Sequence, residues 1–357
     1  MARTVGRKLE ERCERAWLGR GHHVYLFDGT TTLMPDTPGN RAAYPLTHNQ
    51  NEGLPLARVA AVISLSCGVI LDLATARYAG KGQGEVTLLR KLSGVFSAGD
   101  VLLGDCLMGN WRNLPELAER GVRIVTRLNK ALRRADFRKG RRLGKDDHLV
   151  AWPKPHIREV GRAAQRAVPR YLTVREARVF IKQPGFRTKA IVLVTTLLDP
   201  KRYPKEDLTE LYRARWNQEL DLRSIKTTMQ MDVLRCKTPE LVRKGAWTHL
   251  LAYNLIRTVI AQAAAEHGFA PRTLSFKEAM QMLEAFQPLI ARVGPRSHSL
   301  RERLYHELLD AIATHRVANR PDRFEPRRKK KRKAPYDLLM KSRAATKLDI
   351  LKGVSKN

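Results

Sequence analysis

Apolar and polar positions in the first third of the chain predict strands separated by helices. The segments HHVYLFDGTTTLMP, LARVAAVISLSCGVILDLATARY, GDVLLGD and VRIVTRLN are rich in β-branched and apolar residues, which is typical of buried strands. We expect the first to break at Asp28-Gly29, the second to turn at Cys67-Gly68 and the third to end at Asp105. GEVTLLRKLSGVF and NLPELAERG have helical periodicity instead. Together these segments predict a mixed α/β core.

The rest of the chain changes character several times. Residues 129–169 are polar and rich in Pro, Gly, Arg and Lys, and YLTVREARVFI and RTKAIVLVTTLL then predict a strand pair around a turn at 183–185. Residues 204–313 have helical periodicity. We therefore divide the chain into an N-terminal helical segment (1–20), a first core part (21–128), a β-rich insertion (129–203), a helical second core part (204–317) and a basic, weakly ordered tail (318–357).

One predicted helix, LYRARWNQELDLRSIK, has an unusual polar face. At about 100° per residue, Tyr212, Arg215, Glu219 and Lys226 fall within an arc of roughly 60°, with Arg223 at its border. The opposite face is apolar. A solvated amphipathic helix with an i,i+4 pair between Glu219 and Arg223 is one explanation. The alternative is a mainly cationic site that contains one acid.

Composition favours a polyanionic partner. The chain has 357 residues, a formal net charge of +32 and 43% hydrophobic residues, so it combines a substantial core with strong self-repulsion. Nucleic acid is the leading candidate, ahead of an anionic membrane surface, because no basic amphipathic helix has a broad apolar face. We find neither an apolar run of membrane-spanning length nor a signal-peptide core. The four scattered cysteines contain no CxxC pair and indicate reduced thiols of a cytoplasmic protein.

Two aspartates occupy similar places in this pattern. Asp28 and Asp105 each follow an apolar strand, where active-site groups of α/β sheets collect, although a single aspartate there is more often a turn former or helix cap. If Asp28, Asp105 and Glu219 converged in a cationic protein, these three carboxylates would repel one another unless a cation joined them. Magnesium suits such a site, and a pair of ions supports phosphoryl transfer. Arg215 and Lys226 would then contact DNA phosphates, together with Arg223.

The spacing Tyr212-x2-Arg215-x3-Glu219-x6-Lys226 resembles the YREK signature of IS4-type transposases. FDGTTTLMPDTPGN, GDVLLGD, TTLLD, MDVLRCKTPE and HLLAYNLIR are also similar to this family. The resemblance covers about residues 20–290. It implies an RNase H-like catalytic core interrupted by a largely β insertion.

The resemblance also implies a chemistry. Asp28, Asp105 and Glu219 would hold two Mg²⁺ or Mn²⁺ ions for strand cleavage and strand transfer, while Tyr212, Arg215 and Lys226 would contact terminal phosphates. The partners would be double-stranded DNA, as transposon ends and target, and a second copy of the chain in a synaptic complex. The setting would be the nucleoid of a bacterial cytoplasm.

Three further residues allow two interpretations each. Trp152, in the predicted insertion, could stack on a flipped base, but a packing role is favoured. Arg127 ends a strand and is equally a phosphate ligand or a surface arginine. His148 follows two aspartates and is interpreted as part of a polar loop, not of a metal cluster.

The sequence departs from the family pattern in two places. Only 27 residues precede Asp28, where relatives usually carry a helical DNA-recognition region. The run DCLMGNW replaces the Arg and aromatic residues that commonly follow the second aspartate. A relic that only binds DNA through its basic surface is therefore the main alternative, and a structure-specific nuclease on the same fold is a weaker one.

Overall fold

The computed structural model describes residues 1–13, 21–45, 53–111, 113–155, 169–181, 190–293, 297–317 and 343–353. Two features expected from the sequence, the turn at 183–185 and the most basic stretch of the tail, lie outside these residues.

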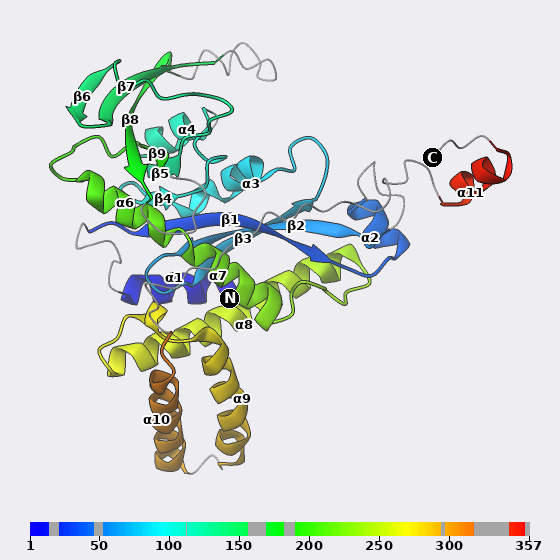
Figure 1. Ribbon diagram of the computed structural model, residues 1–357. Coiled ribbons are helices and arrows are strands. Elements are labelled where there is room, and N and C mark those ends of the chain that lie inside the picture. The colour runs from blue at the N-terminus through cyan, green and yellow to red at the C-terminus, as the bar shows by residue number, and fades with distance from the viewer. Residues whose placement is uncertain are drawn as a thin grey trace.

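The described strands form one sheet in the order β3-β2-β1-β4-β5-β9-β8-β7-β6 (Figure 1). They are β1 (Val24–Leu33), β2 (Leu56–Ser64), β3 (Ile70–Arg77), β4 (Val101–Leu103), β5 (Arg123–Arg127), β6 (Arg141–Gly144), β7 (Asp147–Pro153), β8 (Tyr171–Phe180) and β9 (Ala190–Thr195). β1, β2 and β3 are antiparallel neighbours, and β4 and β5 run parallel to β1. This order and these directions are those of an RNase H-like core.

The predicted β insertion continues the same sheet. β9 pairs antiparallel with β5, and β8, β7 and β6 follow outward. Our interpretation of His148 as a loop residue was wrong, because Asp147 and His148 begin β7 and are buried. Pairing with β8 supplies the backbone partners that make this polar segment a strand.

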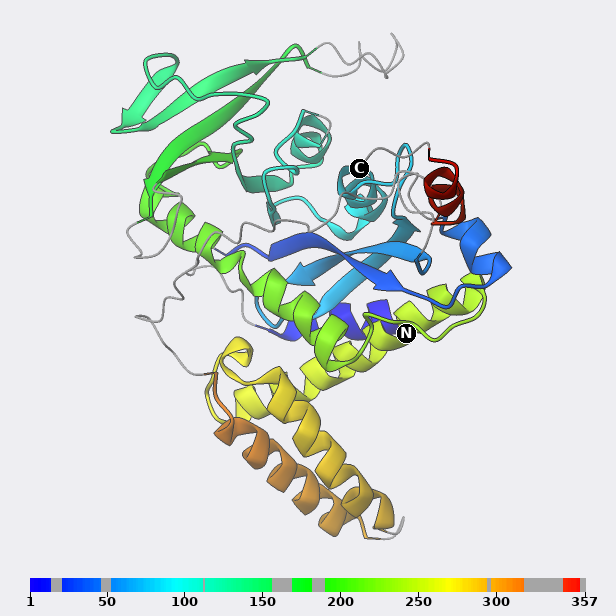
Figure 2. The ribbon, with the colours of Figure 1, turned by 45° about the vertical axis from the view of Figure 1, so that its right-hand side comes forward.

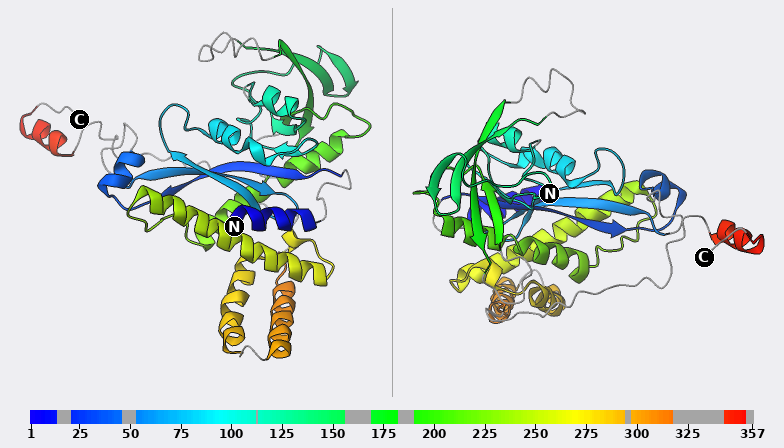
Figure 3. Two further views of the ribbon diagram at one scale, coloured as in Figure 1. Left: turned by 180° about the vertical axis from the view of Figure 1, so that it is seen from behind. Right: turned by 45° about the horizontal axis from the view of Figure 1, so that its top comes forward.

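Helices cover both faces of the core sheet (Figure 2). α3 (Glu85–Leu92) and α4 (Leu114–Glu119) lie on one face, and α1 (Ala2–Arg12), α7 (Asn217–Arg223) and α8 (Pro239–Glu266) lie on the other. Seen from behind, α1 runs beside α8 (Figure 3). The remaining helices are α2 (Pro38–Ala43), α6 (Lys205–Ala214), α9 (Phe276–Arg292), α10 (His298–Thr314) and α11 (Arg343–Leu351), with short turns η1 (Ser93–Val95), η2 (Ser224–Thr228) and η3 (Pro271–Thr273).

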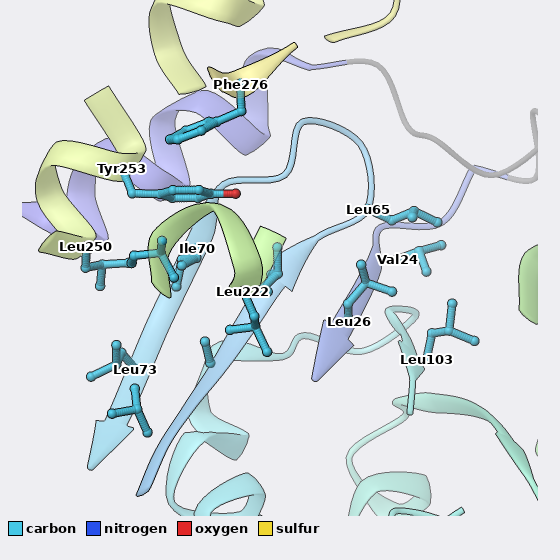
Figure 4. Packing of buried hydrophobic residues seen from close by; sticks show 14 of the residues in the cluster. Val24, Leu26, Leu65, Ile70, Leu73, Leu103, Leu222, Leu250, Tyr253 and Phe276 are labelled. Carbon is cyan, nitrogen blue, oxygen red and sulfur yellow. The ribbon is translucent and has the colours of Figure 1, made fainter. Parts of the chain in front are cut away.

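The alternation of residues along β1 divides the core between the two faces. Val24 and Leu26 pack into the cluster formed with α7 and α8 (Figure 4). Tyr25 and Phe27 pack into the cluster formed with α3 and α4. This period-two pattern follows from strand geometry. It fixes which way the polar residues that follow on β1 point.

The C-terminal helices extend away from the sheet. α9 and α10 form an antiparallel hairpin that packs on the end of α8 (Figures 1 and 2). None of the described helices combines the length and the apolar composition needed to cross a bilayer. The four cysteines are free thiols, and the Cys67 thiol lies 3.7 Å from Glu10 Oε2 and 3.6 Å from the Ser64 hydroxyl.

Candidate active site

Asp28 lies in the middle of β1 and not at its end. The predicted break at Asp28-Gly29 was wrong, because β1 pairs with β2 as far as Leu33 opposite Leu56. This long-range pairing holds both residues in the strand. By the alternation of β1, Asp28 points to the same face as Leu26, toward α7, and one of its carboxylate oxygens accepts a hydrogen bond from the Gly29 amide at 2.8 Å.

Asp105 lies just after β4, the strand beside β1, at the same level of the sheet as Asp28. β4 pairs with β1 in parallel, with Leu103 opposite Leu26, so Asp28 and Asp105 each stand two residues beyond this pair. Asp105 Oδ1 accepts from the Leu107 amide at 2.8 Å, and the Thr126 hydroxyl of β5 donates to the Asp105 carbonyl. The prediction that Asp105 sits beside the end of a strand is confirmed, although β4 ends at Leu103.

Glu219 is carried by α7, which packs across β1. The single helix expected over 211–226 was wrong. α6 ends at Ala214, the chain tightens into i→i+3 hydrogen bonds around Arg215 and Trp216, and α7 passes into the π-helical turn η2 after Arg223. A uniform 100° rotation therefore does not describe the segment. π-turns inside helices occur frequently at functional sites.

Asp28 is electrostatically unusual. Its pKa is raised to about 6, mainly by burial and also by the nearby carboxylates of Glu85 and Asp105, while the Gly29 hydrogen bond and Arg215 act in the opposite direction. Gln218 Nε2 donates to Asp28 Oδ2 at 3.2 Å. The cationic neighbours therefore do not compensate the buried negative charge of this site.

Glu85 is a charged neighbour of Asp28 that the sequence did not indicate. It begins α3 on the opposite face of β1, and a Cβ added to Gly29 would lie 2.7 Å from Glu85 Oε1. Arg58 Nη1 donates to that same oxygen at 2.9 Å. In the sequence, Glu85 is only an acidic residue at the start of a predicted helix, and such residues are too common to identify a site.

Several predicted DNA ligands gather beside Asp105. Arg215 lies over the Tyr212 ring, with its guanidinium carbon 5.7 Å from the ring centroid. Burial raises the pKa of Tyr212. The charges of Arg215 and Arg127 oppose this rise, and the charge of Asp105 adds to it. The pKa of Arg127 is raised mainly by its hydrogen bond to Cys106 and also by the charges of Tyr212 and Asp105. Tyr212, Arg215 and Arg127 thus share one neighbourhood with the carboxylates.

The other predicted DNA ligands are placed differently. Arg223 is exposed at the end of α7, and Lys226 is half-buried in η2. Trp152 lies in β7 of the insertion, is 6% exposed and donates from Nε1 to Glu176 at 2.7 Å. In this conformation the ring offers no open face to a base, which favours the packing interpretation.

Two residues of the run DCLMGNW serve packing. Met108 and Trp111 are buried in the cluster under α3 and α4, whereas Leu107 is 45% exposed. Cys106 lies 3.8 Å from an Arg127 nitrogen. Arg127 therefore supplies a cation beside the second aspartate from a different strand.

The donor chemistry of the site fits hard divalent cations. Asp28, Asp105 and Glu219 offer only carboxylate oxygens, which Mg²⁺ and Mn²⁺ prefer, and the raised pKa of Asp28 shows that negative charge there is costly without a cation. The Glu219 side chain is 42% exposed and lies 3.7 Å from Arg215. Within the described ranges, the trio whose ligand atoms all approach within 4.8 Å is a different one, the exposed Glu266, His267 and Asp310 at the end of α8 and on α10. Asp28, Asp105 and Glu219 are therefore neighbours, but their carboxylate oxygens do not all lie within 4.8 Å of one another.

Comparison with known proteins places this geometry in a family. A family model described as a transposase DDE domain matches residues 19–255. The transposase InsG of insertion sequence element IS4 from Escherichia coli K12 is 32% identical over 283 residues, covering 74% of this chain and 58% of InsG. A putative transposase InsL of IS186A from the same organism is 35% identical over 82 residues, covering 23% of this chain and 21% of that protein.

The chain thus spans less than two thirds of the length of these curated relatives. Among solved structures, a piggyBac transposase synaptic complex with hairpin DNA aligns with a TM-score of 0.43 and 11% identity, covering 79% of this chain and 56% of that one.

Proposed function

We propose that this chain, which belongs to the IS4-type DDE transposase family, cuts DNA at insertion-sequence ends and joins the freed ends to target DNA. The observation that carries the proposal is that Asp28 and Asp105 lie at one level, in β1 and just after the parallel strand β4, with the Glu219 helix packed against β1.

The three acids would hold the divalent ions. Bound Mg²⁺ or Mn²⁺ ions would activate the attacking oxygen and stabilise the leaving oxygen at a phosphodiester. Asp28 is pre-oriented by the Gly29 amide and Gln218, and Asp105 by the Leu107 amide. Glu219 is the most exposed of the three, so its side chain has room to turn from Arg215 toward the aspartates.

The cationic groups around the acids would bind DNA. Arg215, Arg127 and the Tyr212 hydroxyl lie beside Asp105, where they would hold the phosphates that flank the cut. Arg223 and Lys226 extend this contact along α7 and η2. The net charge of +32 supplies long-range attraction to DNA. A homodimer that pairs two DNA ends at the bacterial nucleoid completes the proposal.

The decisive test compares wild type with Glu219→Gln on a duplex that carries the ends flanking the gene. With Mn²⁺, wild type should nick this duplex, and Glu219→Gln should lose at least about a hundredfold in rate because a metal ligand loses its charge. Glu210→Gln, the same change at an exposed position of α6, should cleave normally. DNA binding with no nicking by wild type would support charge-driven binding alone, and equal nicking by Glu219→Gln would refute the site assignment.

A further inference from the structure

The segment HLLAYNLIR of α8 is similar to a segment of the IS4-type transposases, but it contributes no residue to the candidate active site. Three of its polar residues, Tyr253, Asn254 and Arg257, are nevertheless buried. Buried polar side chains require specific partners, since each unsatisfied group costs free energy. Their partners include Asp221, which lies two residues after Glu219 and is 1% exposed.

Asp221 is surrounded by cations. Arg257 Nη2 donates to Asp221 Oδ1 at 2.6 Å, and Arg272 Nη2 donates to Oδ2 at 2.9 Å. The Tyr253 hydroxyl lies 3.3 Å from Oδ1 and accepts from Arg257 Nε at 2.9 Å. Both oxygens of this carboxylate are thus held by charged donors, which make the strongest hydrogen bonds in proteins.

The same groups are anchored to the turn between β2 and β3. Arg272 Nη2 donates to the Ser64 carbonyl at 2.6 Å, and the Tyr253 hydroxyl lies 2.9 Å from the Gly68 carbonyl. Gly68 has a φ of +76°, and a Cβ there would lie 2.9 Å from the guanidinium carbon of Arg257. The backbone of the core sheet therefore approaches the arginine as closely as glycine permits.

The neighbouring apolar contacts support this anchor. Tyr253 stacks on Phe276 with ring centroids 5.0 Å apart, beside the segment of α7 that carries Leu222 (Figure 4). Asn254 accepts from the Ile70 amide at 2.9 Å and donates to the Ile70 carbonyl at 2.8 Å. α8 is thereby fixed to the start of β3.

α7 needs an external anchor. It has only seven residues, follows a turn of i→i+3 bonds and passes into a π-helical turn. Such a short and irregular helix has little stability of its own, so packing must set its position. On α7, Glu219 faces outward while Asp221 faces the core.

We propose that Asp221 is a positioning residue, which sets the place of Glu219 against Asp28 and Asp105 through Arg257, Arg272 and Tyr253. This inference rests on the proposed function. Because Arg272 lies in η3, at the start of the α9–α10 hairpin, the network also ties the C-terminal helices to the active site. Ion pairs buried as deeply as this one add little net stability over apolar packing, so their value lies in geometry.

The test compares Asp221→Asn with Asp147→Asn. Asp147 is a matched control, because it is also buried and accepts from Arg175 at 2.8 and 2.5 Å, but it lies in β7 of the insertion. Three quantities are measured for each full-length variant: Mn²⁺ affinity by electron paramagnetic resonance, cleavage rate as a function of Mn²⁺ concentration, and hydrogen exchange of the α7 amides. Asp221→Asn should weaken Mn²⁺ binding and cleavage by about 10–100-fold and speed exchange in α7. Asp147→Asn should change none of these.

A milder variant covers the case in which Asp221→Asn fails to fold. Arg272 donates from Nη1 to Asp221 Oδ1 at 3.2 Å as well as from Nη2 to Oδ2. Arg272→Lys keeps the charge but loses this bidentate hydrogen bond, and it should show the same changes to a smaller extent. Unchanged α7 exchange and Mn²⁺ affinity in a folded variant, or an equal loss in Asp147→Asn, would overturn the inference. A wild type that neither binds Mn²⁺ nor cleaves would refute the proposed function instead, and α7 exchange would then decide the structural role of the network.

Discussion

The raised pKa of Asp28 predicts that removing its charge stabilises the metal-free protein at alkaline pH. Asp28→Asn keeps the size of the side chain and is neutral at every pH. The Gly29 amide can still donate to the remaining oxygen. Gln218 now donates from Nε2 to Asp28 Oδ2, and once its amide turns over, the new amide can donate to Gln218 Oε1, which is buried without a hydrogen-bond partner. The substitution therefore removes a charge at little cost in hydrogen bonding.

The expected magnitude follows from the size of the pKa shift. Asp28 moves from 3.8 to about 6, so the folded chain binds this proton more tightly than the unfolded chain does. The penalty for ionisation is small below about pH 4 and complete above about pH 7, where it reaches up to about 3 kcal/mol. At pH 5 roughly half of it is present. Asp28→Asn should thus gain about 1.4 kcal/mol more, relative to wild type, at pH 8 than at pH 5.

Urea denaturation in EDTA at the two pH values measures this difference. Packing changes that do not depend on pH cancel between the two conditions. Added Mn²⁺ should then stabilise wild type and have little effect on Asp28→Asn, because only wild type keeps the charged ligand. An equal effect of the substitution at pH 5 and pH 8 would refute the claim that burial and neighbouring acids raise the pKa of Asp28.

Two further predictions concern the DNA-binding assignments. Trp152→Ala should cost about 3–5 kcal/mol of unfolding free energy if the ring is a packing residue, whereas a base-stacking residue would leave urea denaturation unchanged and weaken DNA binding by about 1–3 kcal/mol. Lys226 makes no ion pair within the described part of the chain, so Lys226→Gln should lower the slope of log affinity against log salt by about one. Lys244→Gln, which breaks the exposed pair with Glu240 on α8, is its control, and an equal change of slope there would argue against a specific phosphate contact.

Local pattern was sufficient for much of the fold. Runs of β-branched residues predicted β2, β3, β5, β8 and β9, and helical periodicity predicted α3, α4 and most of the C-terminal half. These elements agree with their own periodicity and with their burial in the final structure. The position of Asp105 after a short apolar run is local information of the same kind. The spacing of the YREK segment likewise belongs to the sequence and pointed to the family before any contact was known.

Tertiary contacts decided the rest. Asp28-Gly29 reads locally as a turn, but β2 pairs across it and keeps it in the strand. Asp147 and His148 read as a polar loop, but Arg175 and Glu176 on β8 satisfy them inside the sheet. Their hydrogen bonds come from residues distant in sequence, so no local pattern could reveal them.

The sequence by itself thus predicted most of the elements, a polyanionic partner and the three candidate acids. Only the tertiary structure decided what surrounds each acid. Glu85 approaches Gly29 from α3 on the other face of β1, and Asp221 meets arginines that lie 36 and 51 residues away. Burial and charge at a site are set by whatever packs around it. Those neighbours come from the whole fold, and therefore the electrostatics of Asp28 and the anchoring of α7 appear only when the chain is folded.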